Sequence, residues 1–237
     1  MNTHLNSPDN QAFLNYLENW LSELPILSFQ EAVPQPEKAA ITSVDMIKGF
    51  CTVGPLASPR IHAIVPSIVQ LLTAGWAHGI RHVLFSQDAH DAQATEFNAY
   101  PPHCVKGTPE AETIDEFKAL PFFDQITILL KNSTSSDVNT GLREWLAQRP
   151  QLDTFLVAGN CTDICVYQLA IFLRVDANTT QTQRRVIIPA DCVATYDRPP
   201  ETAQNQGGFP HPADLLHAIF LYHMALNGVE IVKSIRA

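Results

Sequence analysis

The segment FLVAGNCTDICV, residues 155–166, joins a short apolar run to a polar turn that contains two cysteines. The run FLVA is bounded by Gly159 and therefore predicts a buried strand. A helix is predicted to begin at about Asp163, directly after the turn. A strand, a tight turn and a helix in this order form the unit from which parallel α/β folds are built.

The remaining chain repeats this alternation of strands and helices. Strands are predicted at residues 38–46, 82–86, 126–131, 154–158, 185–189 and 229–233, and further helices at 60–78, 140–148 and 212–225. The predicted strands are short, apolar and rich in β-branched residues. The fold class is therefore predicted as α/β, a doubly wound, Rossmann-like parallel sheet of about six strands with helices on both faces. Two long connections, 88–110 and 190–210, are predicted to be irregular.

Residues 1–37 are predicted to be an N-terminal helical extension, and residues 38–237 the main domain. Pro8 and Asp9 after Ser7 are typical of a helix start. Apolar residues then recur at helical spacing: Phe13, Leu14, Tyr16, Leu17, Trp20 and Leu21. The stretch VPQP ends this segment, and we expect its helix to pack on the main domain.

The composition excludes several classes of protein. The chain has 237 residues and a net charge of −9, without a run of Lys or Arg, so we expect no nucleic-acid or anionic-membrane partner. The longest apolar stretches are too short to span a bilayer. Five cysteines is an odd number, and the polar N-terminus MNTHLNSPDNQ lacks a secretory signal. We therefore expect reduced thiols and a cytoplasmic protein.

Polar side chains follow four of the predicted strands. They are Asp45 after the first, Asp88 and His90 after the second, Lys131 at the end of the third, and Cys161 and Cys165 after the fourth. Ligands of such folds bind beyond the carboxyl ends of the strands. We therefore expect these side chains to meet at one edge of the sheet.

Cys165 is the candidate nucleophile of this group. At the start of a helix the N–H groups and the helix dipole favour a thiolate, and Lys131 adds a positive charge, so a lowered thiol pKa is expected. Asp45 could accept the thiol proton, and N–H groups of the turn could bind an oxyanion. The alternatives are a metal clip, a disulfide between Cys161 and Cys165, or two structural cysteines beside an ordinary Asp45–Lys131 ion pair.

The first long connection contains a candidate metal site. Asp88, His90, Glu96 and His103 offer two imidazoles and two carboxylates, a set suited to zinc, iron or manganese. In an extended segment, Asp88 and His90 point in the same direction. The alternative is a polar loop with two solvated histidines.

Together these motifs resemble the isochorismatase-like cysteine hydrolases, and within them the nicotinamidase branch. Cys165 with Asp45 and Lys131 is similar to the Asp–Lys–Cys triad of that family. Three stretches carry the rest of the resemblance: VDMIKGFC at 44–51, PPHC with the following GTP at 101–109, and GNCTDICV at 159–166. The motifs occur in the family order, and the resemblance covers residues 38–236.

The resemblance implies a role for each matching residue. Cys165 would be the nucleophile, Asp45 would take and return its proton, and Lys131 would pair with both. The peptide bond between Asn160 and Cys161 would be cis, and the backbone N–H groups of Cys161 and Cys165 would form the oxyanion hole. The two cysteines would then not be bonded to each other.

The resemblance also implies one divalent metal ion per chain, with zinc expected first and iron or manganese as alternatives. Its ligands would be Asp88, His90 and His103, with Glu96 in the fourth place, where many relatives have histidine. Phe50 and Tyr100 would hold a pyridine ring between them. Tyr100 departs from the tryptophan that is frequent at its position.

The implied function is a nicotinamidase, an amidohydrolase of NAD salvage that converts nicotinamide, or a close pyridine carboxamide, to the acid and ammonia through a Cys thioester. The first alternative is another hydrolase of this fold, such as an isochorismatase or an N-carbamoyl-amide hydrolase, which lacks the metal set. A thiol-redox or metal-binding module and a catalytically inactive binding protein are the others. The oligomeric state stays open, with a homo-oligomer as one outcome.

Four further residues are predicted to lie outside the site. His211 is assigned a structural or surface role, although the preceding loop could bring it near the strand ends. The remaining cysteines, Cys51, Cys104 and Cys192, are expected to be small buried residues.

Overall fold

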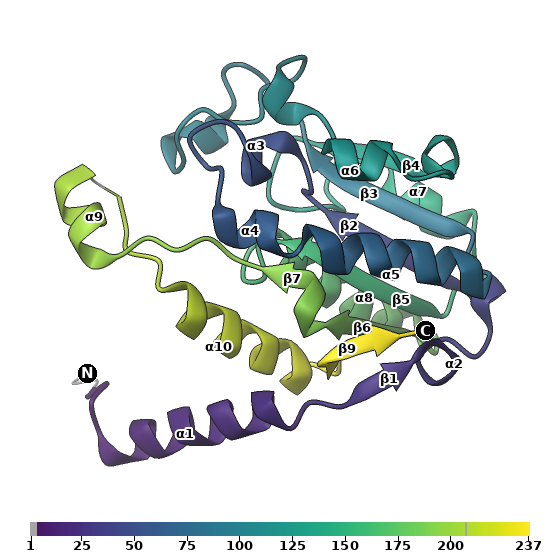
Figure 1. Ribbon diagram of the computed structural model, residues 1–237, viewed down its shortest axis with the longest axis horizontal. Helices are drawn as coiled ribbons and strands as arrows, with labels where there is room; N and C mark the ends of the chain where they lie inside the picture. The colour runs from purple at the N-terminus through teal and green to yellow at the C-terminus, as the bar shows by residue number, and fades with distance from the viewer. Residues whose placement is uncertain (1–3, 207) are drawn as a thin grey trace.

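The computed structural model describes residues 4–206 and 208–237 (Figure 1). Its main sheet has seven strands: β2 (Ala39–Val44), β3 (His82–Asp88), β4 (Thr127–Lys131), β5 (Thr154–Asn160), β6 (Arg185–Pro189), β7 (Val193–Ala194) and β8 (Glu230–Val232). The order is β4-β3-β2-β5-β6-β8, with β7 paired to β5, and the pairings are parallel. The predicted parallel α/β sheet is therefore confirmed, with β7 as an additional strand.

The sheet is buried on both faces because its central strands are apolar on both. Ile41 of β2 and Leu156 of β5 belong to one hydrophobic cluster, whereas Ala40 of β2 and Val157 of β5 belong to another. Successive side chains of a strand point to opposite faces, so continuous apolar runs such as these require a cover on each side. Helices supply both covers.

The helices are α1 (Pro8–Ser22), α2 (Phe29–Ala32), α3 (Lys48–Cys51), α4 (Pro59–Ala63), α5 (Val65–His78), α6 (Asp115–Lys118), α7 (Leu142–Ala147), α8 (Cys165–Thr180), α9 (Pro200–Gln206) and α10 (Ala213–Leu226). Short 3-10 turns lie at Pro36–Lys38, Thr95–Asn98, Pro109–Ala111, Phe123–Gln125 and Ala190–Cys192. Helices α4, α5 and α6 contribute to the first cluster, and α7, α8 and α10 to the second. In Figure 1, α5 lies in front of the sheet and α8 behind it.

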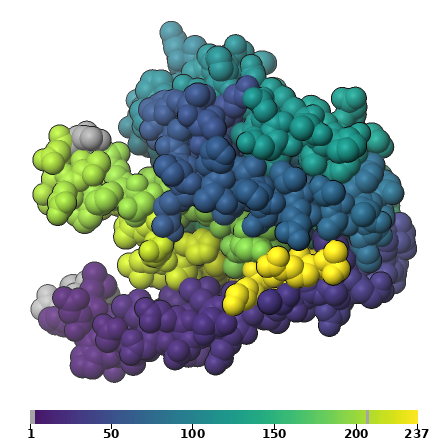
Figure 2. Space-filling model, viewed as in Figure 1, coloured from purple at the N-terminus to yellow at the C-terminus, as the bar shows by residue number. Residues whose placement is uncertain are grey.

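Two features of the helices differ from the prediction. The helix expected over 60–78 is divided into α4 and α5 at Ile64. Pro66 explains the division, because it has no N–H for the preceding turn and its ring would meet that turn's carbonyl. The segment predicted to be irregular at 190–210 contains α9, which stands away from the body of the molecule in Figures 1 and 2.

The N-terminal segment is attached at two places. Helix α1 packs on α10 through aromatic rings, with Trp20 and Phe13 each 5.4 Å from Tyr222 between ring centroids. Strand β1 (Ile26–Ser28) pairs in parallel with β9 (Ser234–Arg236) at the C-terminus. Strands of three residues carry no periodic signal, which is why the sequence did not predict them. None of the helices within the described residues is long and apolar enough to cross a membrane.

Gly159 allows β2 and β5 to approach closely beside the cysteine turn. Its φ is +115°, and a Cβ at this position would lie 2.1 Å from the Val44 carbonyl oxygen. An L-residue would therefore meet both an unfavourable backbone conformation and a backbone clash.

We expect Gly159→Ala to destabilise the protein by about 2–6 kcal/mol, because overpacking and a strained φ each cost about 1–3 kcal/mol. The measurement is the free energy of unfolding in urea. Gly107→Ala is the matched control: its φ is +83°, but no atom lies within 4 Å of the added Cβ. The control should lose only the conformational part, about 1–2 kcal/mol. Equal losses would refute the close approach of β2 and β5.

Candidate active site

A buried lysine connects the strand ends. The Nζ atom of Lys131 lies 2.8 Å from Asp45 Oδ2, contacts Asp88 Oδ1, donates to the Ser133 carbonyl at 3.1 Å, and lies 3.7 Å from Cys165 Sγ. Burial opposes the charge on Lys131, but the two carboxylates outweigh it and raise the lysine pKa well above its ordinary value. Lys131 is therefore a permanent cation at the centre of the site.

Asp45 is held in one orientation just beyond β2. Its backbone has a φ of 53°, its N–H donates to Ser86 O at 2.8 Å, and its carbonyl accepts from Asn160 Nδ2 at 2.6 Å. Its Oδ1 accepts from the Asp88 N–H at 2.8 Å. Burial, and then the charge of Asp88, raise the pKa of Asp45 to about 7. The carboxyl can therefore gain or lose a proton near neutral pH.

Cys165 is the first residue of α8 and interacts with the Asp45 carboxylate. Burial raises the pKa of its thiol well above the ordinary value, although Lys131 lowers it. The expectation of a lowered thiol pKa is therefore wrong for this site, because desolvation outweighs the cation and the start of the helix. The resting residue is a thiol, and Asp45 is the adjacent base that can remove its proton.

The turn before α8 is a compact loop of backbone hydrogen bonds. The N–H groups of Ile164 and Val166 both donate to Cys161 O at 3.1 Å, and Thr162 N–H donates to Ala194 O at 3.0 Å. The peptide bond between Asn160 and Cys161 is cis, as predicted. All five cysteines are free thiols, so the disulfide alternative is excluded. Burial raises the pKa of Cys161 to about 12, which makes it a poor nucleophile.

Asp88, His90 and His103 bring one ligand atom each to within 4.8 Å of one another. Asp88 Oδ2 lies 3.4 Å from His90 Nε2 and 3.9 Å from His103 Nε2. The other nitrogen of each ring faces an oxygen: His90 Nδ1 lies 3.2 Å from Asn132 Oδ1, and His103 Nδ1 lies 2.8 Å from Pro101 O. With Nδ1 as the donor, each Nε2 has its lone pair free for a metal.

A divalent metal fits this group. His90 Nε2 is buried without a hydrogen-bond partner, a costly arrangement that a bound cation would relieve. Burial lowers the pKa of His103 and favours the neutral imidazole that binds metals. Glu96 stands at the edge of the group, with Oε1 3.9 Å from His90 Nε2 and a partly exposed side chain. Nitrogen and carboxylate ligands of this kind suit zinc, iron or manganese.

A pocket of about 460 Å³ opens above these groups. Its lining includes the predicted residues Phe50, Asp88, Glu96, Tyr100, His103, Cys161 and Cys165, whereas Asp45, His90 and Lys131 lie beneath it. The His103 ring contacts both predicted aromatic residues, with ring centroids 5.7 Å from Phe50 and 6.1 Å from Tyr100. The pocket therefore has aromatic walls, the thiol of Cys165 and side chains that can bind a metal ion.

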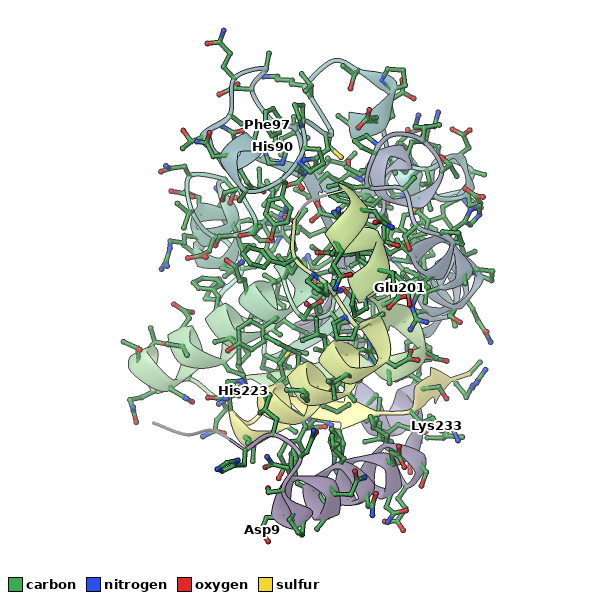
Figure 3. The ribbon with its side chains drawn as sticks, turned by 90° about the vertical axis from the view of Figure 1, so that its left-hand side faces the viewer. Asp9, His90, Phe97, Glu201, His223 and Lys233 are labelled. Atoms are coloured by element: carbon green, nitrogen blue, oxygen red, sulfur yellow. The ribbon has the colours of Figure 1, made fainter. Side chains whose placement is uncertain are left out.

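Sequence reasoning missed several residues of the site. Phe97 packs against both histidines, 5.5 Å from His90 and 5.6 Å from His103 between ring centroids. Figure 3 shows Phe97 and His90 together at one end of the molecule, with Asp9 of α1 at the other. The residues of the pocket lining that were not predicted are Leu56, Ile61, Asn98, Ala99, Pro101, Thr134, Asn160, Ile164, Tyr196, Arg198, Gly208 and Phe209. Pro101, Asn160 and Ile164 lie inside the motifs PPHC and GNCTDICV, whereas most of the others are apolar or loop residues outside any motif, so no local signal could have identified them.

The chain is similar to known proteins in sequence and in structure. The sequence profile described as Isochorismatase domain matches residues 39–216. Nicotinamidase 1 of Arabidopsis thaliana is 29% identical to this chain over 208 residues, which cover 81% of this chain and 84% of the relative.

Two solved structures are similar to this one. A nicotinamidase from Bacillus subtilis is 26% identical, with a TM-score of 0.64, and the match covers 82% of this chain and 99% of that one. A pyrazinamidase of Pyrococcus horikoshii, solved in complex with zinc, is 23% identical, with a TM-score of 0.63 and coverages of 83% and 99%. At that identity the second likeness concerns the fold alone.

We expect Lys131→Met to destabilise the protein by about 3–5 kcal/mol, because it leaves the Asp45 and Asp88 carboxylates buried without their cation. The loss should shrink as the pH falls. Without the cation, the folded-state pKa values of these carboxyls are raised, so they gain their protons at a higher pH in the folded variant than in the unfolded chain. Urea unfolding at several pH values measures both effects. Lys48→Met is the control, because its partners Glu112 and Asp115 are exposed. A loss no larger than that of the control would contradict the central role of Lys131.

Proposed function

The chain belongs to the isochorismatase domain family, and from that premise we propose that it is a nicotinamidase, an amidohydrolase that converts nicotinamide to nicotinate and ammonia. The observation that carries the proposal is that two groups of side chains meet under one pocket. Asp45, Lys131 and Cys165 form one, and Asp88 with the two histidines forms the other. The similarity to plant and bacterial nicotinamidases supports the same substrate class.

Asp45 and Cys165 would carry out the first half of the reaction. As the sulfur adds to the carboxamide carbon, the thiol proton passes to Asp45, whose pKa of about 7 suits this transfer. Lys131 stabilises the negative charge on sulfur and carboxylate alike. The backbone N–H groups of Cys161 and Cys165 would bind the oxyanion of the tetrahedral intermediate.

The same carboxyl group would complete the reaction. Asp45 returns its proton to the nitrogen of the carboxamide, and ammonia leaves as the thioester forms on Cys165. Asp45, again a carboxylate, then takes a proton from the water that attacks the thioester. Asp45 passes this proton to the sulfur as the C–S bond breaks, so the thiol is restored, and the released nicotinic acid ionises to nicotinate. This reaction would give the protein a role in NAD salvage in the cytoplasm.

Asp88, His90 and His103 would hold the divalent metal, with Glu96 beside them, and zinc is the proposed ion. When bound, such a metal supplies a Lewis acid that can hold a heteroaromatic nitrogen. Phe50 and Tyr100 would stack against the substrate ring on the pocket walls.

We expect Cys165→Ala to lose ammonia release from nicotinamide by about 10⁶-fold, as the loss of a nucleophile does in a serine hydrolase, while folding is retained. The measurement is ammonia release, beside a thermal unfolding curve. Cys161→Ala is the matched control, because its backbone N–H remains, and it should be mild. Native protein that releases ammonia only from an N-carbamoyl amide would favour another hydrolase of this fold.

We expect His103→Ala to lower the metal content and to weaken turnover of nicotinamide, while Cys165 remains open to alkylation because Asp45, Lys131 and Cys165 are not among the proposed metal ligands. The measurements are elemental analysis, steady-state kinetics and the rate of carbamidomethylation of Cys165 by iodoacetamide. His62→Ala, at an exposed histidine, serves as the control. Full metal content together with full activity in the His103 variant would refute the metal site.

A further inference from the structure

A buried ion pair beside the nucleophile turn takes no part in the reaction above. Asp163 Oδ2 lies 2.7 Å from His211 Nε2, and the side chains are 6% and 10% exposed. The second carboxylate oxygen accepts from Thr195 Oγ1 at 2.6 Å. His211 is therefore buried rather than on the surface, and it contacts the segment that carries Cys165.

The partners of His211 require a cation. Nε2 faces the Asp163 carboxylate, and Nδ1 lies 2.8 Å from the carbonyl oxygen of Tyr196. Both partners accept hydrogen bonds only, so each ring nitrogen must carry a hydrogen, which makes the ring an imidazolium. The ring also stacks on Tyr196, with centroids 3.8 Å apart and planes 16° apart. Burial opposes the charge on His211, but Asp163 outweighs it and raises the pKa of the imidazole.

The carboxylate of Asp163 stands where a negative charge is unfavourable. It is two residues from Cys161 and two from Cys165, the residues whose N–H groups would bind the oxyanion. Burial and then the Asp163 charge raise the pKa of Cys161, so the charge acts on this turn. Burial opposes ionisation of Asp163, but hydrogen bonds from His211 and Thr195 keep its pKa low. Without His211 the turn would contain an uncompensated carboxylate.

His211 also closes the base of the segment that carries α9. Its N–H donates to Arg198 O at 2.8 Å, and the Arg198 N–H donates to His211 O at 2.9 Å. Asp197 Oδ1 accepts from the N–H of Ala213, the first residue of α10, at 3.0 Å. The pair thus joins the nucleophile turn to the segment from which Tyr196 and Arg198 reach the pocket.

We propose that His211 is a positioning residue for the nucleophile turn: it pairs with Asp163 and supplies the cation that cancels the Asp163 charge beside Cys165. The other titratable groups around the pair are Tyr100, Tyr196, Asp197, Arg198, His217 and Cys161. His217 could not replace His211 as the cation beside Asp163, because burial lowers the pKa of His217 and favours its neutral form. The inference rests on the proposed cysteine chemistry.

The test compares His211→Gln with the double variant Asp163→Asn/His211→Gln. Its readouts are the iodoacetamide alkylation rate of Cys165 at pH 7, followed by peptide mass mapping, and kcat and KM for nicotinamide. His211→Gln should slow alkylation by about tenfold, the effect of one pKa unit on a thiol that titrates above the assay pH, and should lower kcat more than it raises KM. The double variant should recover most of the loss, since a neutral amide pair contains no uncompensated carboxylate.

His223→Gln is the control, because it makes the same substitution at an exposed histidine of α10 that forms hydrogen bonds with Tyr167 and Asn227. Figure 3 shows His223 well away from His90. An unchanged alkylation rate in His211→Gln, or equal losses in the single and double variants, would overturn charge cancellation. If His211→Gln fails to fold, the variant Asp163→Asn tests the proposal instead. Alkylation of Cys165 at least as fast as in the native protein would support the proposal, and a tenfold slower alkylation would overturn it. Absence of nicotinamide turnover in native protein would refute the proposed function alone, because alkylation needs no substrate.

Discussion

The buried ammonium group of Lys131 is the interaction on which the site depends. It lies between the carboxylates of Asp45 and Asp88, so it joins the carboxyl ends of β2, β3 and β4. Two desolvated carboxylates could not remain side by side without such a cation, since their repulsion and their desolvation act in the same direction. Asp88 faces Lys131 with one oxygen and the two histidines with the other. This single carboxylate therefore couples the triad to the metal-ligand group.

Burial decides where the protons of this site reside. The pKa of Cys165 is raised by desolvation, that of Asp45 is raised to about 7, and Lys131 stays charged. In the proposed reaction, Asp45 would therefore take the thiol proton of Cys165 during attack, and Cys165 would not be a thiolate at rest. A neutral thiol also fits the buried position of Cys165 in a partly aromatic pocket, where burial would make an ionised thiolate costly. The Asp163–His211 pair is a second buried ion pair, and its carboxylate lies two residues before Cys165 in the chain.

Much of the fold and the centre of the site could be predicted from the sequence. Continuous apolar runs alternating with helices predicted the parallel sheet, because a strand buried on both faces leaves that local pattern. Asp45, Lys131 and Cys165 could be predicted to meet because they follow parallel strands, whose carboxyl ends share one edge of the sheet. Short elements such as β1 and β7 could not be predicted, since two or three residues contain no period and their pairing depends on remote partners.

The sequence by itself thus determined the sheet, the order of its motifs and the chemical groups at its strand ends, all of which follow from local patterns and from the geometry of parallel strands. Only the tertiary structure decided how these groups are tuned. The raised thiol pKa of Cys165 depends on burial by residues far away in the chain. Glu96 lies just beyond the tight metal-ligand group because a 3-10 turn sets its position. His211 reaches Asp163 through the packing of a segment 48 residues away. Desolvation and long-range contact arise from packing, and no local pattern of residues encodes them.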